Sequence, residues 1–144
     1  MNTHIRAIVR IPALFALAAS LMLASCRSTQ AESEESTSDS VAHISMAEGL
    51  SLLGENPDGV LVDVRTKSEY KQGHIPAAIL FPLGSISEKN AAQILPNKGQ
   101  MIFVYCRSGH RSRIASDKLA KLGYGAIYEI GGIIDYTGEI EKQP

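Results

Sequence analysis

Short apolar runs alternate with amphipathic stretches along most of the chain after residue 40. The two strongest runs, 60–64 and 101–105, are of strand length and are apolar at nearly every position. Continuous apolar runs of this length are typical of parallel strands that are covered on both faces. Shorter runs predict three further strands, at 42–44, 79–81 and 126–129.

Three helix starts lie between these runs and share one local signature. At positions 45, 66 and 85 a serine or threonine is followed three residues later by glutamate. This is the capping-box pattern, which favours a helix N-terminus. We expect the first helix to stop near Gly54, the second before Gly73 and the third before Pro96.

A fourth helix is predicted from near Ser112 to Gly123. Its apolar residues fall on one side of the helix and are Ile114, Ala115, Leu119 and Leu122. Strands and helices therefore alternate through ~100 residues, which favours a single α/β domain with a parallel sheet. We place this domain at residues 41–141.

The first 25 residues have a different character from the rest of the chain. Two arginines and no acidic residue accompany an almost wholly apolar run from 11 to 24, in which Pro12 is the second residue. A helix that crosses a membrane needs ~20 apolar residues, so this run is too short. The pattern predicts a secretory signal peptide.

Leu23-Ala24-Ser25-Cys26 follows this run and resembles the lipobox of bacterial lipoproteins. The resemblance implies that residues 1–25 are removed and that Cys26 is lipidated and becomes the mature N-terminus. The alternative is an ordinary signal peptide with an incidental cysteine. The lipobox implies a periplasm-facing protein of the bacterial cell envelope, and Arg27 in place of an aspartate favours the outer membrane.

A polar segment separates this cysteine from the first predicted strand. Residues 26–40 contain serines alternating with acids and no aromatic residue, so we expect a disordered tether behind the lipid. The whole chain of 144 residues carries 14 Lys and Arg against 15 Asp and Glu. No basic stripe stands out, which argues against a nucleic-acid partner.

Cys106 lies where the second strong strand gives way to the fourth helix. The connecting loop reads Cys106-Arg107-Ser108-Gly109-His110-Arg111. Backbone N–H groups in such a loop and at a helix N-terminus favour an anion at its centre, and nearby cations raise the thiolate fraction of a cysteine. The chain has two cysteines in all. If Cys26 is lipidated, Cys106 is the remaining thiol, and its neighbours favour a reactive thiolate over a structural cysteine.

This loop and its Ser112 match C-x-x-G-x-R-S and resemble the active-site loop of single-domain rhodaneses. The segments 61–65 (Leu-Val-Asp-Val-Arg) and 73–78 (Gly-His-Ile-Pro-Ala-Ala), and the later pair Gly131-Gly132, resemble other signatures of that family. The resemblance spans about residues 41–140. It implies a rhodanese-like domain, a five-stranded parallel sheet with helices on both faces.

The same resemblance implies a sulfurtransferase whose nucleophile is Cys106. The thiolate would take the outer sulfur of a donor such as thiosulfate, hold it as a persulfide and pass it to cyanide or to a thiol. The donor would be bound by the rest of the loop: Arg107, Ser108, Gly109, His110 and Arg111. No metal or organic cofactor is needed, and no Cys/His cluster offers a metal site.

Two alternatives to this enzyme stay open at the level of the sequence. The first is a catalytically weak rhodanese-like module that binds a partner or senses persulfides. The second is a phosphatase or arsenate reductase. Phosphatase loops place an arginine six positions after the cysteine, whereas Arg111 lies five after Cys106, so the second is disfavoured.

Five further positions carry expectations. Asp63 and Arg65 are expected to hold loops by ion pairing rather than to act as an acid–base pair. His74 is expected to be a hydrogen-bonded turn residue, whereas His110 fits a rim position or a catalytic role equally. Ala77 stands where the family has glycine, and we expect an ordinary backbone there.

Overall fold

The computed structural model describes residues 40–143. A five-stranded sheet with the order β1-β5-β4-β2-β3 forms its centre, and every pair of neighbouring strands is parallel. The strands are β1 (Val41–His43), β2 (Val60–Asp63), β3 (Ile79–Leu80), β4 (Ile102–Cys106) and β5 (Ile127–Gly132). The predicted fold class is confirmed. The predicted signal peptide (1–25), Cys26 and all of the predicted tether except Ser40 lie outside the described residues.

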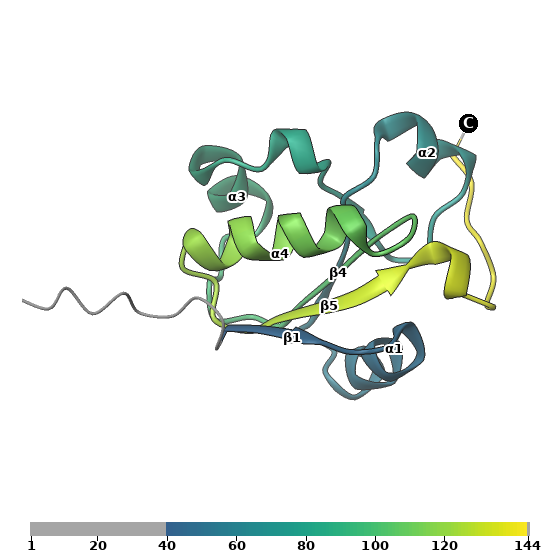
Figure 1. The fold of residues 1–144 in the computed structure, drawn as a ribbon, viewed down its shortest axis with the longest axis horizontal. Coiled ribbons are helices and arrows are strands. Elements are labelled where there is room, and N and C mark those ends of the chain that lie inside the picture. The colour runs from purple at the N-terminus through teal and green to yellow at the C-terminus, as the bar shows by residue number, and fades with distance from the viewer. Residues whose placement is uncertain (1–39, 144) are drawn as a thin grey trace, which may run out of the picture. The chain divides into compact units, whose positions relative to one another are not determined.

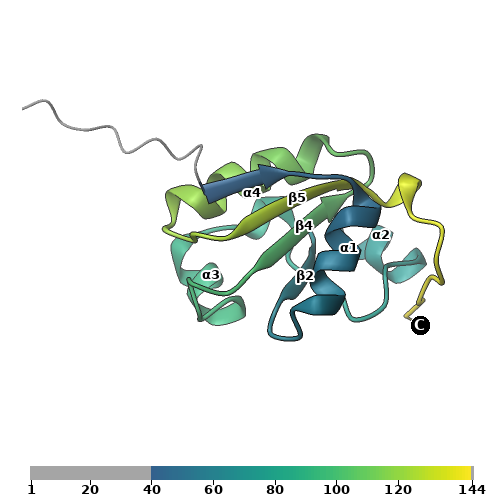
Figure 2. The same ribbon diagram turned by 90° about the horizontal axis from the view of Figure 1, so that it is seen from below.

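Helices cover both faces of the sheet. They are α1 (Met46–Glu55), α2 (Lys67–Gln72), α3 (Glu88–Ile94) and α4 (His110–Lys121), with short 3-10 helices η2 (Leu83–Ser85) and η3 (Ile133–Asp135). The helices α3 and α4 lie on one face and α1 lies on the other (Figures 1 and 2). Within residues 40–143, no helix is both long enough and apolar enough to cross a membrane.

The side chains of β4 alternate between two hydrophobic clusters, one on each face of the sheet. Ile102, Val104 and Cys106 belong to the cluster with α3 and α4, whereas Phe103 and Tyr105 belong to the cluster with α1 and α2. All five side chains are buried. Burial on both faces explains why this run is apolar throughout, and it directs the Cys106 side chain toward the α4 face.

Two of the three predicted helix starts are confirmed. Thr66 and Glu69 form a complete capping box at α2, and Ser45 accepts a hydrogen bond from the N–H of Glu48 at α1. The third prediction was two residues too early, because Ser87 rather than Ser85 caps α3. Residue 85 ends η2, and the chain becomes extended again before α3 begins.

The fourth helix differs from its prediction in start and in orientation. It begins at His110, two residues before Ser112, with Gly109 at the N-cap. Its buried face consists of Ser112, Ala115, Ser116, Leu119 and Ala120. These positions follow the i, i+3, i+4, i+7 spacing of one helix face. Ile114 lies off this face and is 39% exposed, so the prediction that it shares one side of the helix with Ala115 and Leu119 was wrong.

The expectation of an ordinary backbone at Ala77 was also wrong. Its φ is +64°, in the left-handed region, and among residues 40–143 it is the only non-glycine residue with a positive φ. The N–H of Ala78 donates to the carbonyl of Ile75 at 3.1 Å, which closes a turn with Pro76 and Ala77 at its centre. A turn of type II places a positive φ at its third residue, where glycine is favoured.

Candidate active site

The Cys106 sulfur sits inside a ring of hydrogen-bond donors. Sγ accepts a hydrogen bond from the N–H of Gly109 at 3.2 Å. The backbone of Ser108 and the backbone and hydroxyl of Ser112 lie close enough to this sulfur to help lower the pKa of the thiol. The side chain is buried, with Cys106 1% exposed. The start of α4 therefore presents a backbone hydrogen-bond donor to this sulfur.

The ring of donors changes the acidity of Cys106. Burial raises the pKa of the thiol, but the hydrogen bonds from Ser112, Ser108 and Gly109 favour the thiolate, and the net pKa is lower than usual. The N-terminus of α4 adds the positive end of a helix dipole at the same place. Cys106 thus has the environment of a nucleophile.

Two glycines allow the loop to take this shape. Gly109 has a φ of +92°, a conformation that turns its N–H toward the sulfur and that other residues rarely adopt. A side chain at Gly132 of β5 would clash with the backbone of Arg107 and Ser108. The loop also accepts a hydrogen bond, from the N–H of Ile134 to the carbonyl of Arg107. This close approach gives a physical reason for a glycine at position 132.

Arg111, which is predicted to bind the donor, is paired with a carboxylate. Its two terminal nitrogens donate to the oxygens of Glu69 at 2.8 and 2.7 Å. Glu69 also accepts from the N–H of Thr66 in the capping box of α2. The Arg111 hydrogen bonds hold the pKa of Glu69 well below its usual range. One carboxylate thus caps α2 and fixes an arginine of the Cys106 loop.

Beyond the capping box itself, no pattern in the sequence indicates this contact. Residues 69 and 111 are 42 positions apart, and a capping pattern does not say what else its glutamate touches. Of the other predicted loop residues, Ser108 and Gly109 contribute backbone donors. The side chains of Arg107 and His110 are exposed, which places His110 at the rim.

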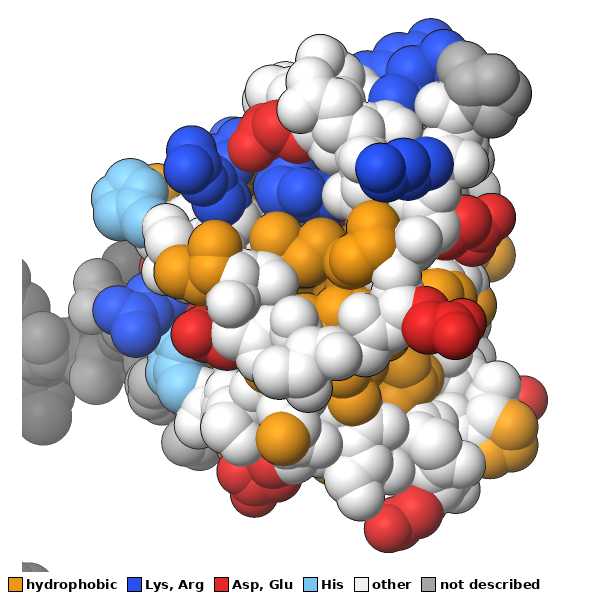
Figure 3. Space-filling model, turned by 90° about the vertical axis from the view of Figure 1, so that its right-hand side faces the viewer, with side chains coloured by type: hydrophobic (Ala, Val, Ile, Leu, Met, Phe, Trp, Pro, Cys, Tyr) orange, Lys and Arg blue, Asp and Glu red, His pale blue; other side chains and the backbone are white. Residues whose placement is uncertain are grey.

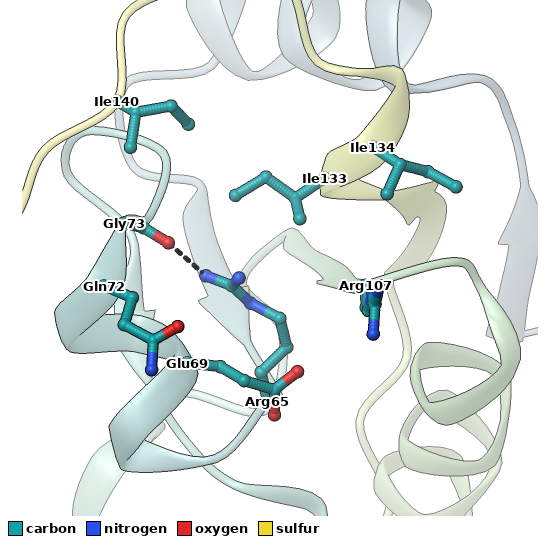
Figure 4. Close-up of a pocket in the computed structure, with 8 residues that line it drawn as sticks. All are labelled: Arg65, Glu69, Gln72, Gly73, Arg107, Ile133, Ile134 and Ile140. Atoms are coloured by element: carbon teal, nitrogen blue, oxygen red, sulfur yellow. Dashed lines mark hydrogen bonds between the residues drawn. The ribbon is translucent and has the colours of Figure 1, made fainter.

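A cleft of about 460 Å³ opens beside the loop. It is lined by Arg65, Glu69, Gln72, Gly73, Arg107, Ile133, Ile134 and Ile140 (Figure 4). Hydrophobic side chains gather in the middle of this side of the molecule, with basic side chains above them (Figure 3).

The charges around the cleft do not all remain available to a ligand. Arg65 is paired with Asp63, and Glu69 is paired with Arg111. Within residues 40–143, the structure records no carboxylate partner for Arg107. This arginine therefore supplies the net positive charge between the cleft and Cys106.

The predicted structural roles of the Asp63–Arg65 pair and of His74 are confirmed. Arg65 donates two hydrogen bonds to one Asp63 oxygen, at 2.9 and 2.6 Å, and one to the carbonyl of Gly73 at 2.7 Å. This buried pair joins the end of β2 to the end of α2. His74 stacks on Tyr70 and lies 2.9 Å from the Tyr70 carbonyl.

A buried carboxylate that sequence reasoning missed lies behind the loop. Glu129, in β5, is 3% exposed. Its Oε1 accepts from the Ser112 hydroxyl at 2.5 Å and from the N–H of Gly131 at 3.0 Å. Its Oε2 lies 3.1 Å from His43 Nδ1 and 3.7 Å from Arg113 Nε. The sequence indicated only a strand at this position.

The site offers no group of metal ligands. In the part of the chain that the structure describes, no three His, Cys, Asp or Glu side chains lie close enough together to hold a metal ion. The arrangement instead suits covalent chemistry on sulfur, with a thiolate for the bond and N–H groups for the charge.

An α/β domain that holds a low-pKa thiol beside N–H donors, at the end of a central parallel strand, is suited to covalent chemistry on sulfur. Comparisons with known proteins show the family. The chain belongs to the rhodanese-like domain family, whose model matches residues 45–139.

Sulfurtransferases are among its relatives. The chain is 35% identical over 74 residues to thiosulfate sulfurtransferase PspE of Escherichia coli, a match that covers 51% of the chain and 70% of PspE. It is 40% identical over 86 residues to a sulfurtransferase of Allochromatium vinosum, covering 59% of the chain and 78% of that protein. A solved structure described as a rhodanese with anions from E. coli is 30% identical, with a TM-score of 0.55, and covers 59% of the chain and 99% of that structure.

Some relatives are much longer than the matched domain. The chain is 34% identical over 101 residues to tRNA uridine(34) hydroxylase of Photorhabdus laumondii. This match covers 67% of the chain but only 29% of the hydroxylase. The rhodanese-like domain therefore occurs both in small sulfurtransferases and as one part of larger proteins.

Proposed function

We propose that this chain is a sulfurtransferase that carries sulfane sulfur as a persulfide on Cys106. The observation that carries the proposal is the buried Cys106 sulfur, which accepts a hydrogen bond from the N–H of Gly109 at the start of α4, and whose pKa is lowered by hydrogen bonding from Ser112, Ser108 and Gly109. The names of PspE and of the A. vinosum relative, and the anions in the E. coli rhodanese structure, support it.

The reaction runs in two displacements on sulfur. The Cys106 thiolate attacks the outer sulfur of thiosulfate, a new S–S bond forms, and sulfite leaves with the electron pair of the broken S–S bond. Cyanide or a thiolate then attacks the outer sulfur of the persulfide, and the Cys106 thiolate leaves. No proton and no external electron is needed. The N–H donors of Ser108 and Gly109 hold the negative charge, and Arg107 attracts the anionic donor along the cleft.

The test is a thiosulfate:cyanide assay combined with the intact mass of the protein. With thiosulfate alone, the wild type should gain about 32 Da, the mass of one sulfur atom, on Cys106. Cys106→Ser keeps the size of the side chain, but a serine hydroxyl is not ionised near neutral pH and forms no persulfide. This variant should fold and lose sulfur transfer completely. An active Cys106→Ser protein would overturn the assignment.

A second candidate is a catalytically weak rhodanese-like module. It would form the persulfide but release the sulfur very slowly, and it would serve to bind a partner or to sense persulfides. The burial of Cys106, which is 1% exposed, favours it, because an acceptor must reach the outer sulfur. The same assay separates the two. A mass gain that persists in the presence of cyanide or a thiol would indicate the module, whereas its rapid loss indicates the enzyme.

We further propose that Cys26 carries a lipid and holds the domain in the bacterial cell envelope, facing the periplasm. The support is the lipobox-like sequence 23–26 at the end of the apolar run. The retention aspartate is absent after this cysteine, which favours the outer membrane.

A further inference from the structure

The cleft beside the Cys106 loop is lined by apolar side chains that solvent can reach. Within residues 40–143, the two most exposed large hydrophobic side chains are Ile134, 66% exposed, and Ile140, 43% exposed. Both line this cleft, together with the half-buried Ile133 (Figure 4). Single exposed apolar side chains are common on protein surfaces, whereas apolar side chains that gather in a hollow mark a binding site.

Backbone contacts hold both apolar walls of the cleft in place. The N–H of Ile134 donates to the carbonyl of Arg107 at 3.3 Å, which ties η3 to the residue that follows the nucleophile. On the other wall, His74 and Glu141 exchange two backbone hydrogen bonds of 2.9 Å, and these fix the neighbouring Ile140. The cleft therefore has its shape before a ligand binds.

The net charge of the cleft lies at the end that adjoins Cys106. Arg107 directly follows this cysteine and lines the cleft, and no carboxylate partner of Arg107 is recorded within residues 40–143. The other two charged residues of the lining, Arg65 and Glu69, are each paired with a residue of opposite charge. A complementary ligand thus has an anionic group close to its reacting sulfur and an apolar body that extends away from it, toward the isoleucines.

Thiosulfate and cyanide use only part of such a site. Both are small anions without apolar surface, whereas a cleft of about 460 Å³ falls in the size range that holds organic ligands. Of the reactants in the proposed function, a thiol acceptor is the one that can carry an apolar body.

We propose that the sulfur acceptor is a small organic thiol with an anionic group beside its sulfur and an apolar tail, and that Ile134 and Ile140 bind the tail. This inference rests on the proposed persulfide of Cys106. The thiol sulfur attacks the outer sulfur of the persulfide anion, and a new S–S bond forms. The old S–S bond breaks with its electron pair on Cys106, and the product persulfide carries the proton of the thiol. No oxidant or reductant takes part.

The first test compares 2-mercaptooctanoate with 2-mercaptopropionate as acceptors, with thiosulfate as the donor. The two share one arrangement of thiol and carboxylate and differ only in the length of the tail. In the wild type, kcat/KM should be roughly tenfold higher for the longer acceptor, which corresponds to burying about two of the added methylene groups. A ratio near one would overturn the proposal.

Variants of the cleft locate the effect. Ile134→Thr and Ile140→Thr keep a branched side chain but replace apolar surface by a hydroxyl, so each should lower the ratio roughly threefold. Ile114→Thr is the matched control, because Ile114 is an exposed isoleucine of α4 that does not line the cleft. It should keep the wild-type ratio. The same ratio in all three variants would contradict the role of the isoleucines.

A second measurement needs no turnover. 2-Hydroxyoctanoate and 2-hydroxypropionate carry a hydroxyl in place of the thiol and accept no sulfur. In NMR spectra of the isoleucine methyl groups of the full chain, 2-hydroxyoctanoate should shift the Ile134 and Ile140 signals and leave that of Ile114 unchanged. It should also bind roughly tenfold more tightly than 2-hydroxypropionate. Signals that respond to protein concentration but not to 2-hydroxyoctanoate would show that a second copy of the chain covers the cleft, which would overturn the proposal.

The two measurements separate this inference from the proposed function. If 2-hydroxyoctanoate binds as expected but no sulfur reaches cyanide or either thiol, the proposed function fails, and the cleft remains a site for acids with an apolar tail. If cyanide and both thiols accept sulfur and the tail changes nothing, the proposed function stands and the inference fails.

Discussion

Backbone N–H groups and arginine side chains around Cys106 differ in how they can stabilise negative charge. The backbone of Ser108 and Gly109 supplies fixed donors, whereas Arg111 is held by Glu69. Within residues 40–143, Arg107 is a cation at the mouth of the site for which no carboxylate partner is recorded. A fixed donor is aimed at the sulfur before any ligand arrives, so it needs no reorganisation during the reaction.

We therefore expect Arg107 to affect the capture of an anionic donor rather than the chemical step. An exposed charge contact contributes up to ~1 kcal/mol, so Arg107→Gln should raise the KM for thiosulfate roughly fivefold with little change in kcat. An uncharged persulfide donor should be used almost as well as before. Lys121→Gln, at the far end of α4, is the charge-matched control. Equal losses with both donors would show that Arg107 acts by shaping the loop.

Ala77 has a left-handed backbone conformation that is unfavourable for a residue with a Cβ atom. A left-handed φ costs an L-residue about 1–2 kcal/mol, and glycine avoids this cost. Against this gain, glycine destabilises the folded state by about 0.4–1 kcal/mol, because it has more conformational freedom in the unfolded chain. Ala77→Gly should thus raise the free energy of unfolding by about 0.5–1 kcal/mol, measured by urea denaturation. Ala78→Gly in the same turn, where φ is not positive, should lower it. A loss of stability in Ala77→Gly would contradict the strain.

Contacts between elements position the loop as much as its own residues do. The Arg111–Glu69 pair joins α4 to α2, and the Asp63–Arg65 pair joins β2 to the end of α2. Helix α2 has six residues, too few to be stable alone. Its place beside the Cys106 loop depends on these links.

The Arg111–Glu69 link should make stability depend on acid pH. Because the pKa of Glu69 is lowered on folding, the pair contributes its full stability above the unfolded-state pKa of about 4.3 and loses it progressively as the pH falls below that value. Glu69→Gln should be less stable than the wild type at pH 7 and should lose less stability on acidification.

Glu48→Gln is the matched control for this prediction, because Glu48 is the corresponding third residue of α1. No arginine partner of Glu48 is recorded within residues 40–143. Its unfolding curves from neutral to acid pH should follow those of the wild type. The same acid dependence in Glu69→Gln and in the wild type would show that the pair adds nothing to stability.

At the scale of the whole molecule, local patterns predicted the sheet but not the contacts across it. The runs at 60–64 and 101–105 became β2 and β4 because burial on both faces needs apolar residues at every position. The Glu69–Arg111 and Ser112–Glu129 contacts join residues that are 42 and 17 positions apart. Neither leaves a periodic pattern. The position of Cys106 was predictable from its loop, but its carboxylate neighbour was not.

The proposed lipid anchor on Cys26 can be tested by membrane fractionation. If it is lipidated, the wild type should fractionate with membranes of the producing bacterium, and Cys26→Ser should move to the soluble fraction with its domain intact. Cys106→Ser should stay with the membranes, since it leaves the N-terminal segment unchanged. A wild type found in the soluble fraction and without lipid on its mass would contradict the anchor.

The parallel direction of all five strands separates the start of the described chain from Cys106. The described chain enters at the amino end of β1, whereas Cys106 stands at the carboxyl end of β4 (Figure 1). In a parallel sheet these ends lie on opposite sides of the domain. Whatever precedes residue 40 therefore joins the domain on the side opposite to Cys106, and the side of the domain that carries the thiol stays clear of that junction.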